Sequence, residues 1–122
     1  MKFKNRPKVR IKTELNHDSG VAYFTLIKKN KVKDTEIGKL EVDIGREHKF
    51  LVISSHIDLT YRNNGFGKML YERALKKLGK LKTQFYEASH EAQRVWVSLA
   101  KKYKHRKSFF EGTLILRNKL NN

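Results

Sequence analysis

The segment from Tyr61 to Lys68 combines residue types that bind phosphate groups. Gly65 and Gly67 allow positive φ values and let another molecule approach the backbone closely. If a helix begins at Gly67, the amides of its first turn have no partner within the helix and point outward. The helix dipole and the cations Arg62 and Lys68 add positive charge at the same end. The segment therefore predicts an anion-binding turn, and a tight strand-to-helix turn without a ligand is the alternative.

Two known phosphate-binding motifs do not fit this segment. A Walker loop needs Ser or Thr after its lysine, and Met69 follows Lys68. The dinucleotide-binding fingerprint needs a third glycine, and Leu70 stands at that position. A Walker-type nucleotide site and a dinucleotide site are therefore both excluded.

Cysteine and metal chemistry are not expected. The chain has no Cys, which excludes disulfides, thiolate zinc sites and cysteine nucleophiles and favours a reducing cytoplasm. The histidines are scattered over different predicted elements without a pair at ligand spacing on one helix, namely His17, His48, His56, His90 and His105. Because no apolar run approaches the roughly 20 residues of a bilayer span, the sequence predicts a cytoplasmic protein without a membrane partner.

The charge of the chain predicts an anionic partner. Among 122 residues, 28 are Lys or Arg and 12 are Asp or Glu, which gives a net charge of +16. Residues 1–59 contain 13 basic and 8 acidic residues, whereas residues 60–122 contain 15 and 4. Such a field attracts nucleic acid, an acidic protein or a phosphorylated cofactor. A solubilising coat of lysines is the alternative.

The elements that must position the turn begin with four strands. Apolar and polar residues alternate over 9–15, and residues 21–27 are β-branched and aromatic. A run of turn-forming residues, 16–20, separates these two strands. Residues 36–44 alternate again, and 50–59 is a nearly continuous apolar run of the kind buried on both faces of a sheet.

Helical spacing starts at Gly67 and ends at Gly79, which stands where a C-terminal cap belongs. Residues 81–87 predict a fifth strand, and Ser89 is a plausible N-cap of a second helix. The apolar stripe of that helix is Ala92, Val95, Trp96, Leu99, Ala100 and Tyr103. A basic stretch follows, and Gly112 to Arg117 predicts the last strand.

These elements predict an α+β fold in the order β-β-β-β-α-β-α-β. The chain has no internal repeat and no low-complexity linker. We therefore expect a basic N-terminal lead over residues 1–8 and a single domain over residues 9–122.

The join from Ile57 to Gly67 resembles the Arg/Gln-x-x-Gly-x-Gly/Ala loop, with its preceding strand, of the GNAT superfamily of acyl-CoA-dependent N-acetyltransferases. Residues 37–42 look like the third strand of that family, and residues 89–96 look like its later helix. The resemblance covers roughly residues 20–116. It implies a mixed, mostly antiparallel central sheet with a β-bulge and a splay between two strands, and two main helices.

The resemblance also implies a mechanism. In that family the loop amides hold the pyrophosphate of acetyl-CoA, and its pantetheine arm pairs with the preceding strand where the next strand splays away. An amine then attacks the thioester directly, and a backbone amide near Ile57 stabilises the oxyanion. The implied cofactor-binding residues are Ile57, Asp58, Leu59, Arg62, Asn63, Asn64, Gly65, Phe66, Gly67 and Lys68.

The usual catalytic side chains of the family are missing. Leu51, Ile53 and Gln84 stand at strand positions where relatives often carry Glu or His. Trp96 matches the helix tyrosine that commonly protonates the departing thiolate, and Tyr103 lies further along the same apolar stripe as a core residue.

Other polar groups near the implied site are His56, Asp58, Tyr86, Glu87 and His90. His56 is the first candidate for a catalytic base, because histidine ordinarily titrates near neutral pH. A strand histidine satisfied by its neighbours is the alternative. Glu87 is the second candidate, whereas Asp58 and Tyr61 are expected to be turn residues.

The short turn over residues 16–20 predicts an open acceptor side. Family members usually place one or two helices there, and these form a wall of the acceptor pocket. The resemblance implies transfer of an acetyl group to a primary amine. Because the short turn leaves the acceptor side open, we expect a macromolecular or otherwise bulky acceptor, such as a protein.

A nucleic-acid-binding module on the same fold, without catalysis, is the alternative function. It rests on the basic lead over residues 2–12 and on Phe109 and Phe110, which would stack on bases if exposed. The main basic tract supplies Lys101, Lys102, Lys104, Arg106 and Lys107. A solvated helix end accounts for the same tract without any ligand.

Overall fold

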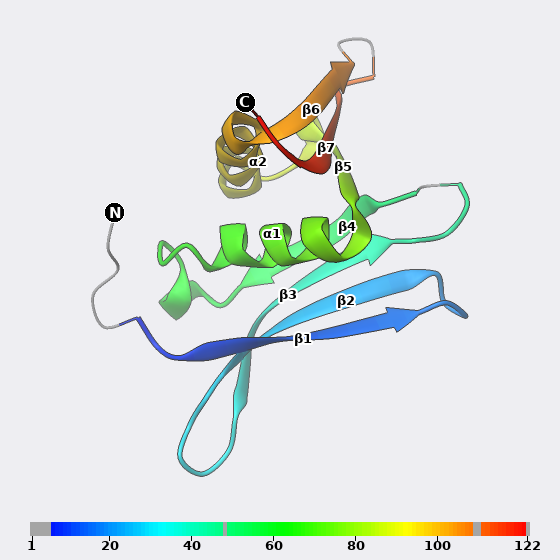
Figure 1. Cartoon of the computed structure of the whole chain (residues 1–122). Coiled ribbons are helices and arrows are strands. Elements are labelled where there is room, and N and C mark those ends of the chain that lie inside the picture. The colour runs from blue at the N-terminus through cyan, green and yellow to red at the C-terminus, as the bar shows by residue number, and fades with distance from the viewer. Residues whose placement is uncertain (1–5, 48, 109–110, 122) are drawn as a thin grey trace.

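The computed structural model describes residues 6–47, 49–108 and 111–121 (Figure 1). The strands are β1 (Val9–Asn16), β2 (Val21–Lys28), β3 (Thr35–Asp43), β4 (Leu51–Ile57), β5 (Lys80–Gln84), β6 (Tyr103–Ser108) and β7 (Thr113–Leu120). The helices are α1 (Phe66–Leu78) and α2 (His90–Lys102), with short 3₁₀ turns η1 (Leu59–Tyr61) and η2 (Phe85–Glu87).

The strands form one seven-stranded sheet in the order β1-β2-β3-β4-β5-β7-β6. Neighbouring strands are antiparallel except β4 and β5, which are parallel. The predicted α+β class with a mostly antiparallel sheet is therefore confirmed. The helix α1 forms the crossover between β4 and β5, as a parallel connection requires.

The core lies between the sheet and its helices. The predicted apolar stripe of α1 is buried at Leu70, Ala74 and Leu75, because these residues recur at helical spacing on one face. Trp96 of α2 is fully buried and meets Tyr71 of α1 edge to face, with ring centroids 5.2 Å apart. This contact fixes the two helices against each other.

Local signals define the helix ends as predicted. The Ser89 hydroxyl accepts a hydrogen bond from the Ala92 amide at 3.1 Å, which caps α2. Gly79 adopts φ 89° after α1, a left-handed conformation that favours glycine.

Three predictions about strands were wrong. Residues 85–87, expected to end the fifth strand, form η2, so β5 ends at Gln84. Residues 103–108 form β6, so the observed order has one strand more than predicted, and Tyr103 starts this strand although it is buried as expected. The tract is so polar because β6 lies at the edge of the sheet, where one side of the strand faces solvent. β4 is also shorter than predicted and largely exposed, because β5 covers only its first residue.

The predicted turn at residues 16–20 is confirmed, since β1 and β2 form a hairpin with Asn16 opposite Val21. No helix stands between these strands. Among the described residues, no helix combines the length and apolar composition needed to cross a membrane.

Candidate functional site

The strands β4 and β5 separate almost as soon as they meet. Among the described residues, their only register pair is Leu51 with Lys82, next to a hydrogen bond from the Lys82 amide to the Phe50 carbonyl at 2.8 Å. Beyond this point β5 turns away from β4 (Figure 1). The backbone edge of β4 that would face β5 is therefore left without a strand partner, and residues 53–56 are exposed.

A β-bulge lies in β4 at the start of this opening. Glu41 pairs with Ser54 and Val42 pairs with Val52, so Ile53 is an additional residue without a partner on β3. The Ile53 residue is 52% exposed. Bulges bend the strand that carries them and increase its local twist, so this bulge contributes to the divergence from β5.

The loop between β4 and α1 leaves several amides unpaired. Gly65, the N-cap of α1, has φ 75° and Asn63 has φ 64°, so the chain turns sharply twice. The Asn64 side chain pins the turn by donating to the carbonyls of Tyr61 and Arg62, at 3.1 and 3.3 Å. Within the described part of the chain, the amides of residues 63–68 have no hydrogen-bond acceptor.

Cationic side chains surround the start of α1. Arg62 Nε donates to the Ile57 carbonyl at 2.9 Å, and its Nη1 lies 3.6 Å from a Glu91 carboxylate oxygen, so Arg62 ties the end of β4 to α2. The Arg6 guanidinium lies over the Phe66 ring, 4.7 Å from the centroid. The described end of the basic lead, residues 6–8, thus passes beside the helix start, and the rest of the lead lies outside the described residues.

The first catalytic candidate is paired with a carboxylate. His56 Nε2 lies 3.0 Å from Asp58 Oδ1, and both side chains are about half exposed. Because Ser55 pairs with buried Leu40 and His56 pairs with Lys39, His56 projects from the sheet face opposite α1. An imidazole held by a carboxylate has the arrangement of a general base.

The second candidate, Glu87, ends η2 and is exposed. His56 lies near the end of β4, and Glu87 follows the end of β5. Since β4 and β5 are parallel, these two ends lie at the same edge of the sheet. Asp58 and Tyr61 are turn residues, as expected, because the Tyr61 amide donates to the Asp58 carbonyl at 2.8 Å.

Sequence reasoning missed Tyr71. Its hydroxyl donates to Ser55 Oγ on β4 at 2.9 Å, and its residue is 3% exposed. Burial raises the pKa of Tyr71, and its hydrogen bond to Ser55 offsets only part of this effect. The only sequence signal was a tyrosine next to Leu70 on the apolar stripe of α1, which a core residue explains equally well.

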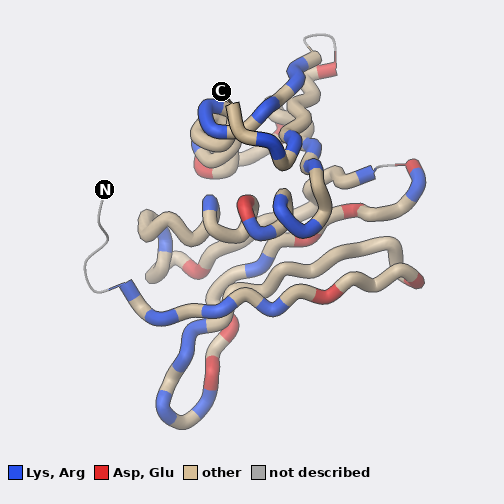
Figure 2. Tube along the Cα trace, viewed as in Figure 1, with Lys and Arg blue, Asp and Glu red and all other residues tan. Residues whose placement is uncertain are grey.

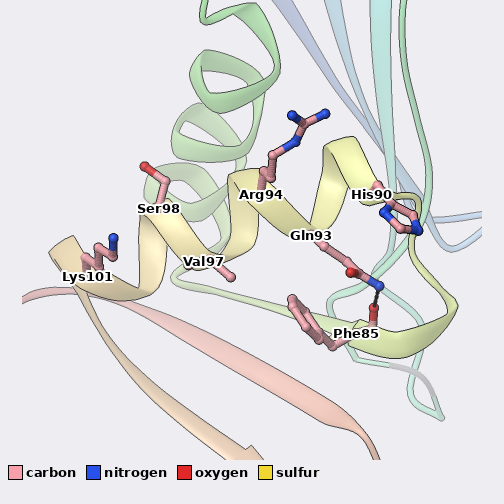
Figure 3. A pocket seen from close by; sticks show the side chains of 7 residues that line it. All are labelled: Phe85, His90, Gln93, Arg94, Val97, Ser98 and Lys101. Carbon is pink, nitrogen blue, oxygen red and sulfur yellow. Dashed lines mark hydrogen bonds between the residues drawn. The ribbon is translucent and has the colours of Figure 1, made fainter.

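An open surface cavity of about 560 Å³ lies along α2 (Figure 3). The Gln93 amide donates to the Phe85 carbonyl at 2.9 Å and closes one end of it. Its lining residues are Phe85, His90, Gln93, Arg94, Val97, Ser98 and Lys101. His90 is thus placed in this cavity, whose lining includes none of the predicted cofactor-binding residues.

The predicted basic tract is divided between two elements. Lys101 and Lys102 end α2, whereas Lys104, Arg106 and Lys107 belong to β6. Lys102 Nζ donates to Glu72 Oε2 at 2.8 Å, so its charge is neutralised by α1. Phe109 and Phe110 lie outside the described residues.

No metal centre is formed by the residues that the structure describes, since no three His, Asp or Glu side chains are grouped to hold an ion.

Comparisons with known proteins indicate the fold alone. No protein-family model matches the chain, and no curated protein sequence matches it. Among solved structures, a domain from Methanocaldococcus jannaschii DSM 2661 is similar, with a TM-score of 0.54 and 14% sequence identity. The match covers 83% of this chain and 68% of that chain. The chain therefore shares its arrangement of strands and helices with an archaeal domain.

Proposed function

We propose that this chain is a GNAT-type N-acetyltransferase that transfers an acetyl group from acetyl-CoA to a primary amine on a bulky acceptor. The observation that carries the proposal is the separation of parallel strands β4 and β5 after one register pair, directly before a loop with unpaired amides. A thioester arm needs such an open strand edge, and a diphosphate needs such amides.

The residues of the loop fit a diphosphate. The amides of residues 63–68 are hydrogen-bond donors without an acceptor among the described residues. Gly67 has no side chain, so the backbone of α1 is accessible at this point. A Cβ at Gly67 would meet Val95 Cγ2 at 3.6 Å, an ordinary contact, so the core does not require glycine here. Close approach of a ligand to the backbone does give a reason for glycine.

The acceptor amine must lose a proton. A lysine-like amine with a pKa of about 10.4 is neutral in roughly one molecule in 2,500 at pH 7, so a base assists the attack. In the proposal His56 accepts this proton, and the Asp58 carboxylate at 3.0 Å orients the ring. The new C–N bond forms as the C–S bond breaks.

The departing thiolate must gain a proton, and we assign this role to Tyr71. Its ring touches Trp96, which matches the position of the family's catalytic tyrosine. Its hydroxyl reaches β4 at Ser55, and burial keeps it protonated by raising its pKa. A phenol supplied by α1 would thus replace the one that α2 lacks.

The acceptor would approach from the uncovered face of the sheet. His56 projects from that face, and the hairpin of β1 and β2 places no helix over it. A bulky acceptor can reach an open face more easily than an enclosed pocket, which supports a macromolecular amine.

Calorimetric titration with acetyl-CoA tests the proposal through Gly67→Ala. We expect the wild-type chain to bind and the variant to bind about tenfold more weakly, a loss of about 1.4 kcal/mol. The melting temperature should stay equal or rise, because alanine favours a helix by about 1 kcal/mol over glycine.

Lys77→Ala, at the other end of α1, is the matched control. It adds an alanine to the same helix and should leave the affinity unchanged. The absence of heat with wild-type protein at high acetyl-CoA concentration would refute the proposed function.

A further inference from the structure

The three C-terminal strands carry only positive charge. β5, β6 and β7 contain Lys80, Lys82, Lys104, Arg106, Lys107, Arg117 and Lys119, and no Asp or Glu. Strands β1 and β3, in contrast, each carry both signs. Figure 2 shows Lys and Arg gathered on the C-terminal strands and α2, with few acidic residues among them. The net charge of the chain is therefore concentrated in one half of the sheet.

The register places the cations on one face of the sheet. Lys80 lies opposite Arg117, and Lys82 lies opposite Ile115, which in turn lies opposite Arg106. Directly opposed residues share a face, and so do alternate residues of one strand. The opposite face carries the buried residues Leu81, Thr83, Leu114 and Leu116 beneath the helices. We call the surface formed by Lys80, Lys82, Arg106, Arg117 and Lys119 the basic sheet face.

Contacts within the fold account for only part of this arrangement: Lys80 Nζ lies over the Phe50 ring, 5.4 Å from its centroid. Like charges directly opposite each other, such as Lys80 and Arg117, destabilise a sheet. Among the described residues, none of the five cations forms an ion pair. Lysines protect an edge strand from pairing with another chain, and this explains the charge of β6. It does not explain β7, which pairs with β5 on one side and with β6 on the other.

A nucleic acid strand fits this surface better than an acidic protein. Alternate residues of a strand repeat about every 6.7 Å, so Lys80 with Lys82 and Arg117 with Lys119 form two pairs of cations at a spacing that a chain of phosphates can follow. An exposed aromatic residue stands at the end of these strands, with Lys107 Nζ of β6 5.5 Å from its ring centroid. This residue is Tyr86, which is 65% exposed. It follows Phe85 in η2, just after β5, and its ring packs against Phe85 and against Gly112, the residue before β7. Exposed aromatic rings next to cations are typical of proteins that bind single strands by stacking.

We propose that the basic sheet face binds single-stranded nucleic acid through its phosphates, with Tyr86 stacking on a base. This site shares Arg106 with the basic tract of the sequence but differs from it otherwise, because Lys101 and Lys102 lie on α2 and do not contribute. It is also independent of the acetyl-CoA site, since it uses none of the residues from 57 to 68.

Fluorescence anisotropy with a labelled single-stranded oligonucleotide tests this site on the full chain. The variant Arg117→Gln/Lys119→Gln removes two exposed cations from the basic sheet face. The control Arg73→Gln/Lys76→Gln removes one exposed Arg and one exposed Lys from α1 on the other face. We expect the first variant to bind at least tenfold more weakly and to lower the slope of log affinity against log salt by about 2, whereas the control should change affinity less than twofold.

Tyr86→Ala and competition with polyglutamate separate nucleic acid from an acidic protein. Tyr86→Ala removes the ring on which one base stacks and should weaken oligonucleotide binding about fivefold or more. Polyglutamate should compete poorly at equal charge concentration. Equal effects of the two double variants, equal competition by polyglutamate, or no binding at low salt would each overturn the proposal. Acetyl-CoA titration of the same variants should be unchanged, so failure here is distinguishable from failure of the proposed function.

Discussion

At the scale of single residues, the pairing of His56 with Asp58 follows from the strand itself. Residues two apart in an extended chain project to the same side, and the 3.0 Å contact lies where β4 ends. Both groups are exposed, so the pair contributes little to folding stability. The pair is therefore accessible to a reactant at the open end of β4.

His56→Gln should therefore slow acetyl transfer without unfolding the chain. We expect kcat to fall about 100-fold, in the range of a lost general base, and the affinity for acetyl-CoA to stay unchanged. Steady-state kinetics with a lysine-containing peptide and calorimetry measure the two quantities. A variant with the kcat of the wild-type protein would show that His56 is a structural strand residue.

The proposed role of Tyr71 as a proton donor is tested by two variants that break the same hydrogen bond. Tyr71→Phe removes the phenol, whereas Ser55→Ala removes its partner and keeps the phenol. If Tyr71 is the proton donor, kcat should be at least tenfold lower for Tyr71→Phe and nearly normal for Ser55→Ala. Both should lose about 1 kcal/mol of stability. Equal kcat values in the two variants would mean that the bond only supports the fold.

At the scale of elements, one carboxylate joins α1 to the end of α2 and to β6. Glu72 Oε2 accepts hydrogen bonds from Tyr103 Oη at 2.6 Å and from Lys102 Nζ at 2.8 Å. Burial opposes ionisation, but these hydrogen bonds and the Lys102 charge outweigh it and lower the pKa of Glu72. The same contacts raise the pKa of Lys102. The cluster fixes the point where the chain turns from helix into the last hairpin.

Glu72→Gln should destabilise the chain in a pH-dependent way. Because the folded pKa is below the unfolded value of about 4.3, the carboxylate stabilises the fold above that pH, and the effect is lost as pH falls through the lower folded pKa. We expect a loss of about 1 kcal/mol at pH 7, or about 4 °C in melting temperature. Thermal melts at pH 7 and pH 3 should show this difference shrinking in acid. A difference that is equal at both pH values would contradict the assignment.

At the scale of the whole molecule, the sheet divides into two surfaces with different character. β1 to β4 present a face of mixed charge that ends at His56, and β5 to β7 present the basic sheet face. The opening between β4 and β5 lies at the boundary. An acceptor attached to, or associated with, a nucleic acid would lie across both surfaces. The salt dependence of oligonucleotide binding therefore tests whether the net charge of +16 serves to bind nucleic-acid phosphates.

The sequence by itself determined the elements whose signals are local. Alternation located β1 and β3, β-branched and aromatic composition located β2, and the apolar stripes located both helices. Ser89 and Gly79 were recognised as caps because capping depends on a few neighbouring residues. The turn into α1 was recognised for the same reason, since glycine suits the positive φ of Gly65, whereas the positive φ of Asn63 was not predicted.

Only the tertiary structure decided the features that depend on distant partners. β6 is a strand because β7 pairs with it, although its own residues are too polar to indicate one. The separation of β4 from β5, the bond from Tyr71 to Ser55 and the basic sheet face all depend on register between segments far apart in the chain. Residue type and periodicity determine which face of a strand is apolar, but hydrogen bonding between strands determines which side chains meet.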